Sequence, residues 1–209
     1  HMAGQSADMR SIYALSKKYN FKIIEDASHA IGGSYLDEKV GSCRYSDITV
    51  FSFHPVKIIT TGEGGVAVTN SEELVLKMQQ LRSHGISRDP KDWKKKNKEA
   101  WYYEMLDLGF NYRLTDFQAA LGLSQMTKLS QNIIKRNSLA LNYEKLLDKD
   151  KLLLPSISKA ANSTYHLYIV QVRNKACRSA VFKELRDKGI GVNVHYIPVH
   201  LQPYYLDLG

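Results

Sequence analysis

Residues 47–69, which read DITVFSFHPVKIITTGEGGVAVT, decide the fold class of this chain. Asp47 to Phe53 and Gly65 to Thr69 are short apolar runs rich in β-branched side chains, so each predicts a buried strand. The segment between them contains Pro55, Lys57 and a turn of threonine and glycine residues. The stretch therefore predicts two strands of an α/β sheet, joined by a loop that carries a lysine.

Further strand and helix patterns alternate on both sides of this stretch. Upstream, Phe21 to Ile24 predicts a strand that delivers Asp26 at its carboxyl end. Because ligands bind beyond the carboxyl ends of strands in open α/β sheets, Asp26, Ser52 and Lys57 are expected at one edge. Apolar spacing and capping residues predict helices at 9–19, after a cap at Asn70, from a Thr115–Gln118 capping box to about Thr127, across 129–147 and at 178–188.

The pattern changes near Leu152, after which the segments become shorter. Tyr165 to Val172 and Gly191 to His195 predict strands on either side of the last helix. We therefore expect a large α/β domain over residues 1–150 and part of a smaller α+β domain over residues 151–209.

The composition is that of an ordinary soluble globular protein, with 44% hydrophobic and 24% charged residues. The formal net charge of +8 favours an anionic partner. Cys43 and Cys177 match no metal-ligand spacing, so we expect no metal site and interpret both thiols as reduced. Without a signal peptide or an apolar run of roughly 20 residues, we expect a cytoplasmic protein with no membrane partner.

Lys57 is the candidate catalytic residue. A lone lysine is most often a solvated surface residue, but Asp26, His29, Ser52 and a glycine turn accompany this one. A lysine amine forms a Schiff base with pyridoxal phosphate, a carboxylate keeps the ring nitrogen protonated, and hydroxyl and backbone donors bind the phosphate. The turn at 62–65 matches neither a P-loop nor a dinucleotide-binding fingerprint. The combination predicts a Schiff-base cofactor site.

Five motifs resemble the DegT/DnrJ/EryC1/StrS family of sugar aminotransferases, and the resemblance extends from about His1 to Tyr205. They are IEDASHA at 24–30, SFHPVK at 52–57, TGEGG at 61–65, GFNYRLTD at 109–116 and HYIPVH at 195–200. The resemblance implies an α/β protein of the pyridoxal-phosphate fold-type I class. Residues 1–150 would form part of its large domain, with a mixed, mostly parallel sheet and helices, and residues 151–209 part of its small α+β domain.

The resemblance also implies roles for individual side chains. Lys57 would hold pyridoxal phosphate and move a proton during the reaction, while Asp26 would pair with the pyridine nitrogen. His29 would contact the ring or its 3-oxygen, and Ser52 would donate to the phosphate. Asn111 would reach the phosphate of the neighbouring subunit's cofactor, which implies a homodimer with shared active sites.

The implied substrates are a sugar nucleotide and an amino acid donor. The sequences around Lys57 and at 101–105 resemble those of transaminases from the pseudaminic acid pathway, which aminate C4 of a UDP-linked 4-keto-6-deoxy-N-acetylhexosamine. Glutamate is the expected donor. Relatives that dehydrate sugars carry histidine in place of the lysine, so Lys57 favours transamination. Four residues would lie near the sugar nucleotide: Arg113, His195, Tyr196 and His200.

Two other functions remain open at this point. Family members are longer, so we expect a truncated form that binds the cofactor poorly and is inactive, or a non-catalytic dimerisation or interaction fragment. Residues 88–98 interleave lysines with Trp93, which is also a feature of nucleic-acid-binding segments. No recognition-helix motif accompanies them, so we expect no nucleic-acid partner. A loop that attracts the UDP pyrophosphate fits the resemblance better.

Overall fold

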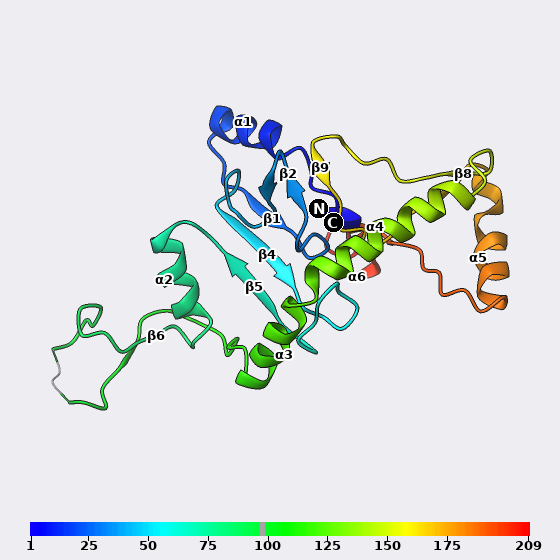
Figure 1. The fold of residues 1–209 in the computed structure, drawn as a ribbon. Helices are drawn as coiled ribbons and strands as arrows, with labels where there is room; N and C mark the ends of the chain where they lie inside the picture. The colour runs from blue at the N-terminus through cyan, green and yellow to red at the C-terminus, as the bar shows by residue number, and fades with distance from the viewer. Residues whose placement is uncertain (97–98) are drawn as a thin grey trace. The chain divides into compact units, whose positions relative to one another are not determined.

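The computed structural model describes residues 1–96 and 99–209, which form two compact units, each with its own internal contacts (Figure 1). The larger unit comprises His1–Leu146 and Pro155–Ile169, and the smaller unit comprises Leu147–Leu154 and Val170–Gly209. The assignment of residues 1–150 and 151–209 to separate domains stays a prediction.

A three-stranded mixed sheet organises the larger unit (Figure 1). β1 (Ile24–Asp26) pairs parallel with β4 (Ile48–Ser52), which pairs antiparallel with β5 (Gly65–Val68). The prediction that the first strand covers Phe21 to Ile24 is wrong, because the chain joins the ladder only at Ile24. The Asp47 carboxylate accepts the amide hydrogen of Ile23 at 2.9 Å, so a side chain satisfies the backbone just before the strand.

The two faces of this sheet differ in burial. Glu25, Thr49 and Phe51 lie on the buried face, whereas Ile24 and Val50 on the other face are 66% and 36% exposed. Two apolar clusters form the core of the larger unit. Their buried members are Met9, Ile23, Tyr35 and Ala161 in one, and Ala27, Ala30 and Phe51 in the other.

The helices of the larger unit begin at capping side chains. α1 (Met9–Tyr19) follows Asp8, and α3 (Asp116–Met126) follows Thr115, where the predicted capping box is present. α2 (Glu72–Leu81) is capped by Ser71 instead of the expected Asn70. The Asn70 amide donates to the carbonyl oxygen of Ser42 at 2.8 Å, so its side chain serves another part of the chain. The long helix is α4 (Leu129–Leu146).

Short elements complete the larger unit. β2 (Ser34–Tyr35) pairs with both β3 (Glu38–Lys39) and β9 (Ala161–Asn162), and this pairing ties residues around 160 to the first quarter of the chain. β6 (Ile86–Ser87) and β7 (Glu104–Met105) form a separate antiparallel pair. A 3₁₀ turn, η1 (Met2–Gly4), precedes α1.

The smaller unit contains β8 (Leu152–Leu153) paired antiparallel with β10 (Gln171–Val172). Only the last two residues of the predicted strand at 165–172 are therefore in a ladder, since Tyr165 has a positive φ of 44° that ends any extended run. The predicted strand from Gly191 to His195 is also wrong, because the amide of Val192 bonds locally to Ile190. The remaining elements are η2 (Lys175–Cys177), α5 (Arg178–Asp187), η3 (Val199–Leu201) and α6 (Pro203–Leu206).

Among residues 1–96 and 99–209, no helix is both long and apolar enough to cross a bilayer. In the same residues, no group of three or more His, Cys, Asp or Glu side chains is arranged to hold a metal ion.

Candidate active site

The candidate site begins where two neighbouring parallel strands end. Asp26 is the last residue of β1 and pairs in register with Val50 of β4, and Ser52 is the last residue of β4. Because side chains two residues apart in a strand share a face, Asp26 and Ser52 lie on the same face of the sheet. This face is the exposed one, so both polar groups are accessible.

The carboxylate of Asp26 is kept ionised by its own turn. The amide of Ser28 donates to Asp26 Oδ1 at 3.0 Å, which forms a short turn directly after the strand. Interaction with the Ser28 hydroxyl and then with this amide lowers the pKa of Asp26 below its ordinary value, against a raising effect of partial burial. Asp26 is therefore an anion at neutral pH.

Lys57 lies on a turn that follows Ser52 directly. The carbonyl oxygen of His54 accepts the amide hydrogen of Lys57 at 2.9 Å, and the amide of His54 approaches Ser52 Oγ at 3.4 Å. Downstream, the carbonyl of Phe53 accepts both the hydroxyl of Thr60 at 2.9 Å and the amide of Thr61 at 3.0 Å. These bonds close the loop, so that half-buried Lys57 is held near the end of β4.

The glycine turn lets two backbone segments approach closely. A Cβ on Gly65 would lie 2.7 Å from the carbonyl oxygen of Phe51 on the paired strand. At Gly64 the φ of 151° is rare for other residues, and a Cβ would lie 2.4 Å from Thr61 Oγ1. The amide of Phe53 bonds to the carbonyl of Gly64 at 2.8 Å. Glycine is thus required to bring the turn against the lysine loop.

His29 follows Asp26 by three residues and is half-buried. Its Nδ1 accepts the amide hydrogen of Ala3 at 3.2 Å, and its ring centroid lies 4.4 Å from that of His166. His166 could not be identified from the sequence, because it lies far along the chain in a segment expected to be a strand. Ser28 could have been found from the Asp-x-Ser spacing, which is typical of a turn closed by a carboxylate.

The remaining site residues expected from the sequence lie on other elements. Asn111 forms an isolated antiparallel bridge with Ser83, and Arg113 is exposed in the same segment of the larger unit. His195, Tyr196 and His200 belong to the smaller unit, where the rings of His195 and Tyr196 meet edge to face at 4.6 Å. The structure thus groups Asp26, His29, Ser52 and Lys57 on adjoining segments, whereas the substrate-binding assignments stay predictions.

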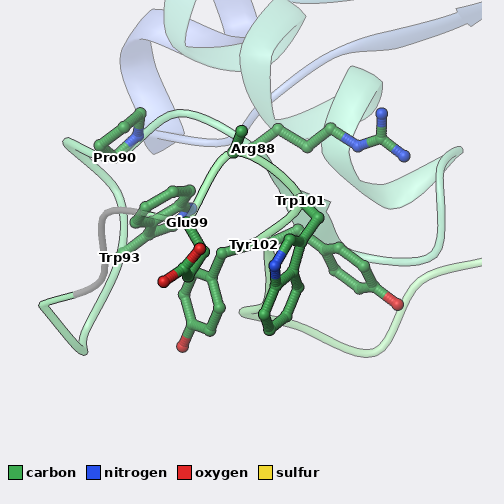
Figure 2. Close-up of a pocket in the computed structure, with 8 residues that line it drawn as sticks. Arg88, Pro90, Trp93, Glu99, Trp101 and Tyr102 are labelled. Atoms are coloured by element: carbon green, nitrogen blue, oxygen red, sulfur yellow. The ribbon is translucent and has the colours of Figure 1, made fainter.

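A concave surface lies on the loop between β6 and β7 (Figure 2). Residues 97–98 of the basic segment 88–98 lie outside the described residues, but the rest of that segment is described. Trp93 and Tyr102 pack edge to face at 4.8 Å, and the Tyr102 hydroxyl donates to Glu104 at 2.9 Å. The cleft has a volume of about 520 Å³ and is lined by Arg88, Pro90, Trp93, Glu99, Ala100, Trp101, Tyr102 and Tyr103.

Comparisons with known proteins identify the family of this chain. The family model described as "DegT/DnrJ/EryC1/StrS aminotransferase family" matches residues 1–209. A Campylobacter jejuni UDP-4-amino-4,6-dideoxy-N-acetyl-beta-L-altrosamine transaminase is 43% identical over 209 residues, which cover 99% of this chain and 53% of the relative. The chain thus spans about half the length of the curated relatives it matches.

Solved structures give the same result. Helicobacter pylori PseC, an aminotransferase of pseudaminic acid biosynthesis, superposes with a TM-score of 0.87 at 35% identity, over 99% of this chain and 54% of that one. The Streptococcus pneumoniae putative sugar aminotransferase Spr1654 in its PLP-form gives a TM-score of 0.86 at 28% identity, over 100% and 56% of the two chains.

These matches confirm the predicted fold class, part of a pyridoxal-phosphate fold-type I enzyme, and the predicted cofactor of the family, pyridoxal phosphate. Taken with the strand-end position of Asp26, Ser52 and Lys57, they show that the chain belongs to the DegT/DnrJ/EryC1/StrS aminotransferase family.

Proposed function

We propose that the strand-end site with Lys57 belongs to a pyridoxal-phosphate-dependent aminotransferase acting on a nucleotide sugar. The amino group would move from an amino acid, glutamate, to C4 of a UDP-linked 4-keto-6-deoxy-N-acetylhexosamine. The observation that carries this proposal is the placement of Asp26 and Ser52 at adjacent parallel strand ends, with Lys57 on the turn that follows.

The residues present suit the cofactor chemically. An ionised carboxylate at Asp26 is the partner that a protonated pyridine nitrogen requires, and the lowered pKa keeps it ionised. Ser52 offers a hydroxyl, and the glycine turn brings backbone donors close to the lysine loop without side-chain obstruction. Lys57 supplies the amine that such enzymes use to hold the cofactor covalently.

Bound pyridoxal phosphate supplies an electron sink that lets a proton leave a carbon atom next to an amine. Lys57 would accept that proton through its amine and return it at a neighbouring atom, as a general base and then a general acid. Asp26 would keep its charge throughout and orient its cationic partner. Ser52 would fix the phosphate end, so that the proton travels a short, constant distance.

The substrate and partners follow from the relatives. The name of the Campylobacter jejuni relative specifies a UDP-linked amino sugar with the amine at C4. We infer that Arg113, His195, Tyr196 and His200 bind the sugar nucleotide. Asn111 would reach the cofactor phosphate of a second subunit, in a cytoplasmic homodimer with shared sites.

The aromatic cleft of the β6–β7 loop suits the nucleotide end of such a substrate. Trp101 is 73% exposed, so its indole face is available for a planar base or a sugar ring. In Figure 2 the guanidinium of Arg88 extends away from the carboxylate of Glu99, and its positive charge would attract an anion such as pyrophosphate.

Borohydride trapping tests the proposed cofactor site. Pyridoxal phosphate is added at increasing concentration and reduced onto lysines, and the modified peptides are identified by mass spectrometry. We expect saturable labelling of Lys57, whereas Lys22, whose side chain is 87% exposed, labels slowly and without saturation. Asp26→Asn should reduce the labelling of Lys57 alone. Equal labelling of all exposed lysines would contradict the proposal.

The same titration tests whether these 209 residues are sufficient to bind the cofactor and to react with glutamate. Because they span about half of the relatives, we propose that they hold the cofactor weakly and do not complete a glutamate half-reaction by themselves. A tight cofactor absorption band that is lost in Lys57→Arg, together with turnover of glutamate, would overturn that part. Selective labelling of Lys57 without turnover separates a weak site from a purely structural interaction fragment, which would show no selectivity.

A further inference from the structure

The imidazole of His29 is held in one tautomer. The amide of Ala3 donates to Nδ1 of His29 at 3.2 Å, so this nitrogen must present a lone pair. A neutral imidazole that accepts at Nδ1 carries its proton on Nε2. His29 therefore carries its N–H at Nε2.

Residues 163–167 form hydrogen bonds with the segments that carry both partners of this bond, Ala3 and His29. The Thr164 hydroxyl donates to the carbonyl oxygen of His29 at 2.8 Å, although 135 residues separate them. The amide of Thr164 donates to Gly4 at 3.0 Å, and the amide of Leu167 donates to Ala3 at 3.3 Å. Residues 163–167, the strap, thus fix the position of Ala3 relative to His29.

The ring of His166 completes the strap. It is buried, with 9% exposed, and its centroid lies 4.4 Å from that of His29 with an angle of 40° between the planes. Two rings at this separation are in contact, so His166 limits how far the His29 ring can rotate.

Helix α4 holds the strap through Arg136. This is the one charged side chain in a series at helical spacing that otherwise consists of Leu129, Ile133, Ala140, Tyr143 and Leu147. Arg136 Nη1 donates to the carbonyl oxygens of Tyr165 at 3.0 Å and His166 at 3.2 Å. Asn137 Nδ2 adds a bond to the carbonyl of Ser163 at 3.1 Å. A charged donor shared by two successive carbonyls stabilises the positive φ at Tyr165, which brings His166 against His29.

We propose that Arg136 and His166 are positioning residues that keep His29 in its Nε2–H tautomer and in a fixed orientation. Why this orientation matters rests on the proposed function, in which His29 contacts the cofactor. An Nε2–H donor matches an anionic oxygen, and a freely rotating imidazole would present a donor for only part of the time.

Nitrogen-15 NMR of the histidine side chains tests the tautomer without any cofactor. In the wild type, with His29 assigned through the loss of its signals in His29→Gln, we expect the Nε2–H pattern. Arg136→Met should convert His29 to a mixture of tautomers, and Lys135→Met, a matched change at an exposed neighbour on the same helix, should leave it unchanged. An Nδ1–H pattern in the wild type would overturn the proposal, as would an unchanged His29 in folded Arg136→Met.

A second pair of variants keeps the test decisive if Arg136→Met does not fold. His166→Phe keeps a planar ring against His29, whereas His166→Ala removes it, so only the alanine variant should shift the His29 signals. If both or neither shift them, ring contact does not position His29. A pyridoxal phosphate titration of the same variants then adds the functional arm, with at least a threefold loss of affinity expected in Arg136→Met and His166→Ala. If the wild type binds no cofactor, the proposed function fails while the NMR result still decides the positioning.

Discussion

Replacing Glu25 with alanine should destabilise the larger unit strongly. Glu25 is only 8% exposed and accepts hydrogen bonds from three groups. The donors are Ser46 Oγ at 2.5 Å, Thr49 Oγ1 at 3.1 Å and His1 Nε2 at 2.6 Å. The side chains of the His1–Glu25 pair are 3% and 7% exposed, so water does not replace a lost partner easily.

The size of the effect follows from this burial. Removing one partner of a buried pair costs about 3–5 kcal/mol, and a buried hydroxyl left without an acceptor costs about 1–3 kcal/mol. Thr49 is fully buried, but its hydroxyl also lies 3.3 Å from Ser46 Oγ and 3.4 Å from Cys43 Sγ, which offers partial relief. We therefore expect Glu25→Ala to lower the free energy of unfolding by about 3 kcal/mol, a large fraction of a typical domain stability.

Urea denaturation followed by circular dichroism and tyrosine fluorescence measures this change. The two signals should show the same transition before a two-state free energy is calculated. Glu25→Gln keeps an amide oxygen for Ser46 and Thr49 and should cost about 1–2 kcal/mol. Glu38→Ala, which removes a carboxylate from a solvent-exposed pair with Arg44, is the matched control and should change little. If Glu25→Ala costs less than about 1 kcal/mol, the buried network does not stabilise the sheet.

Three further changes test other parts of the larger unit. Asp8→Ala should loosen the start of α1 and make the loss of stability in acid less steep. The Tyr35 hydroxyl lowers the pKa of Asp8, so the stability that Asp8 contributes is present above the ordinary carboxyl pKa and disappears as the pH falls through the lowered pKa. The Tm measured at a series of acidic pH values tests this. An unchanged acid limb would refute this. Gly85→Ala should lower the Tm far more than Gly189→Ala, because both glycines have positive φ but only at Gly85 would a Cβ lie 1.8 Å from a backbone oxygen. Equal Tm shifts would show that the cost comes from the positive φ alone and not from the steric clash. Thr115→Ala should cost about 1 kcal/mol in urea through loss of the capping box, and Thr115→Ser should restore it.

Elements with strong local signals could be predicted from the sequence. Helix α1 begins and ends at the predicted residues, since apolar spacing and a capping Asp8 act within a few positions. The capping box at Thr115 is equally local. Predictions failed where a distant group competed with a local one, as at Asn70, whose amide bonds to Ser42. The segment from Gly191 to His195 has strand composition, but composition does not provide a pairing partner.

Within the candidate site, too, some positions could be predicted from the sequence and others could not. The positions of Asp26 and Ser52 at strand ends, and of Lys57 on the loop after β4, could be predicted because parallel strands end at a common edge of the sheet. The contact between His29 and His166 could not, because no periodicity relates positions so far apart. Arg136 was visible as a charge in an apolar series, and the structure gives the reason: its guanidinium bonds to two carbonyl oxygens.

The two carboxylates of β1 show how one strand serves both stability and chemistry. Side chains alternate across a strand, so Glu25 points to the buried face and Asp26 to the exposed one. The buried carboxylate accepts from three donors, His1, Ser46 and Thr49, and these bonds fix the position of β1 and therefore of the next residue, Asp26. The exposed carboxylate is held by its own turn through Ser28 and keeps its charge. Because a shift of one residue in register would exchange the two environments, the network around Glu25 also fixes which carboxylate lies on the exposed face of the sheet.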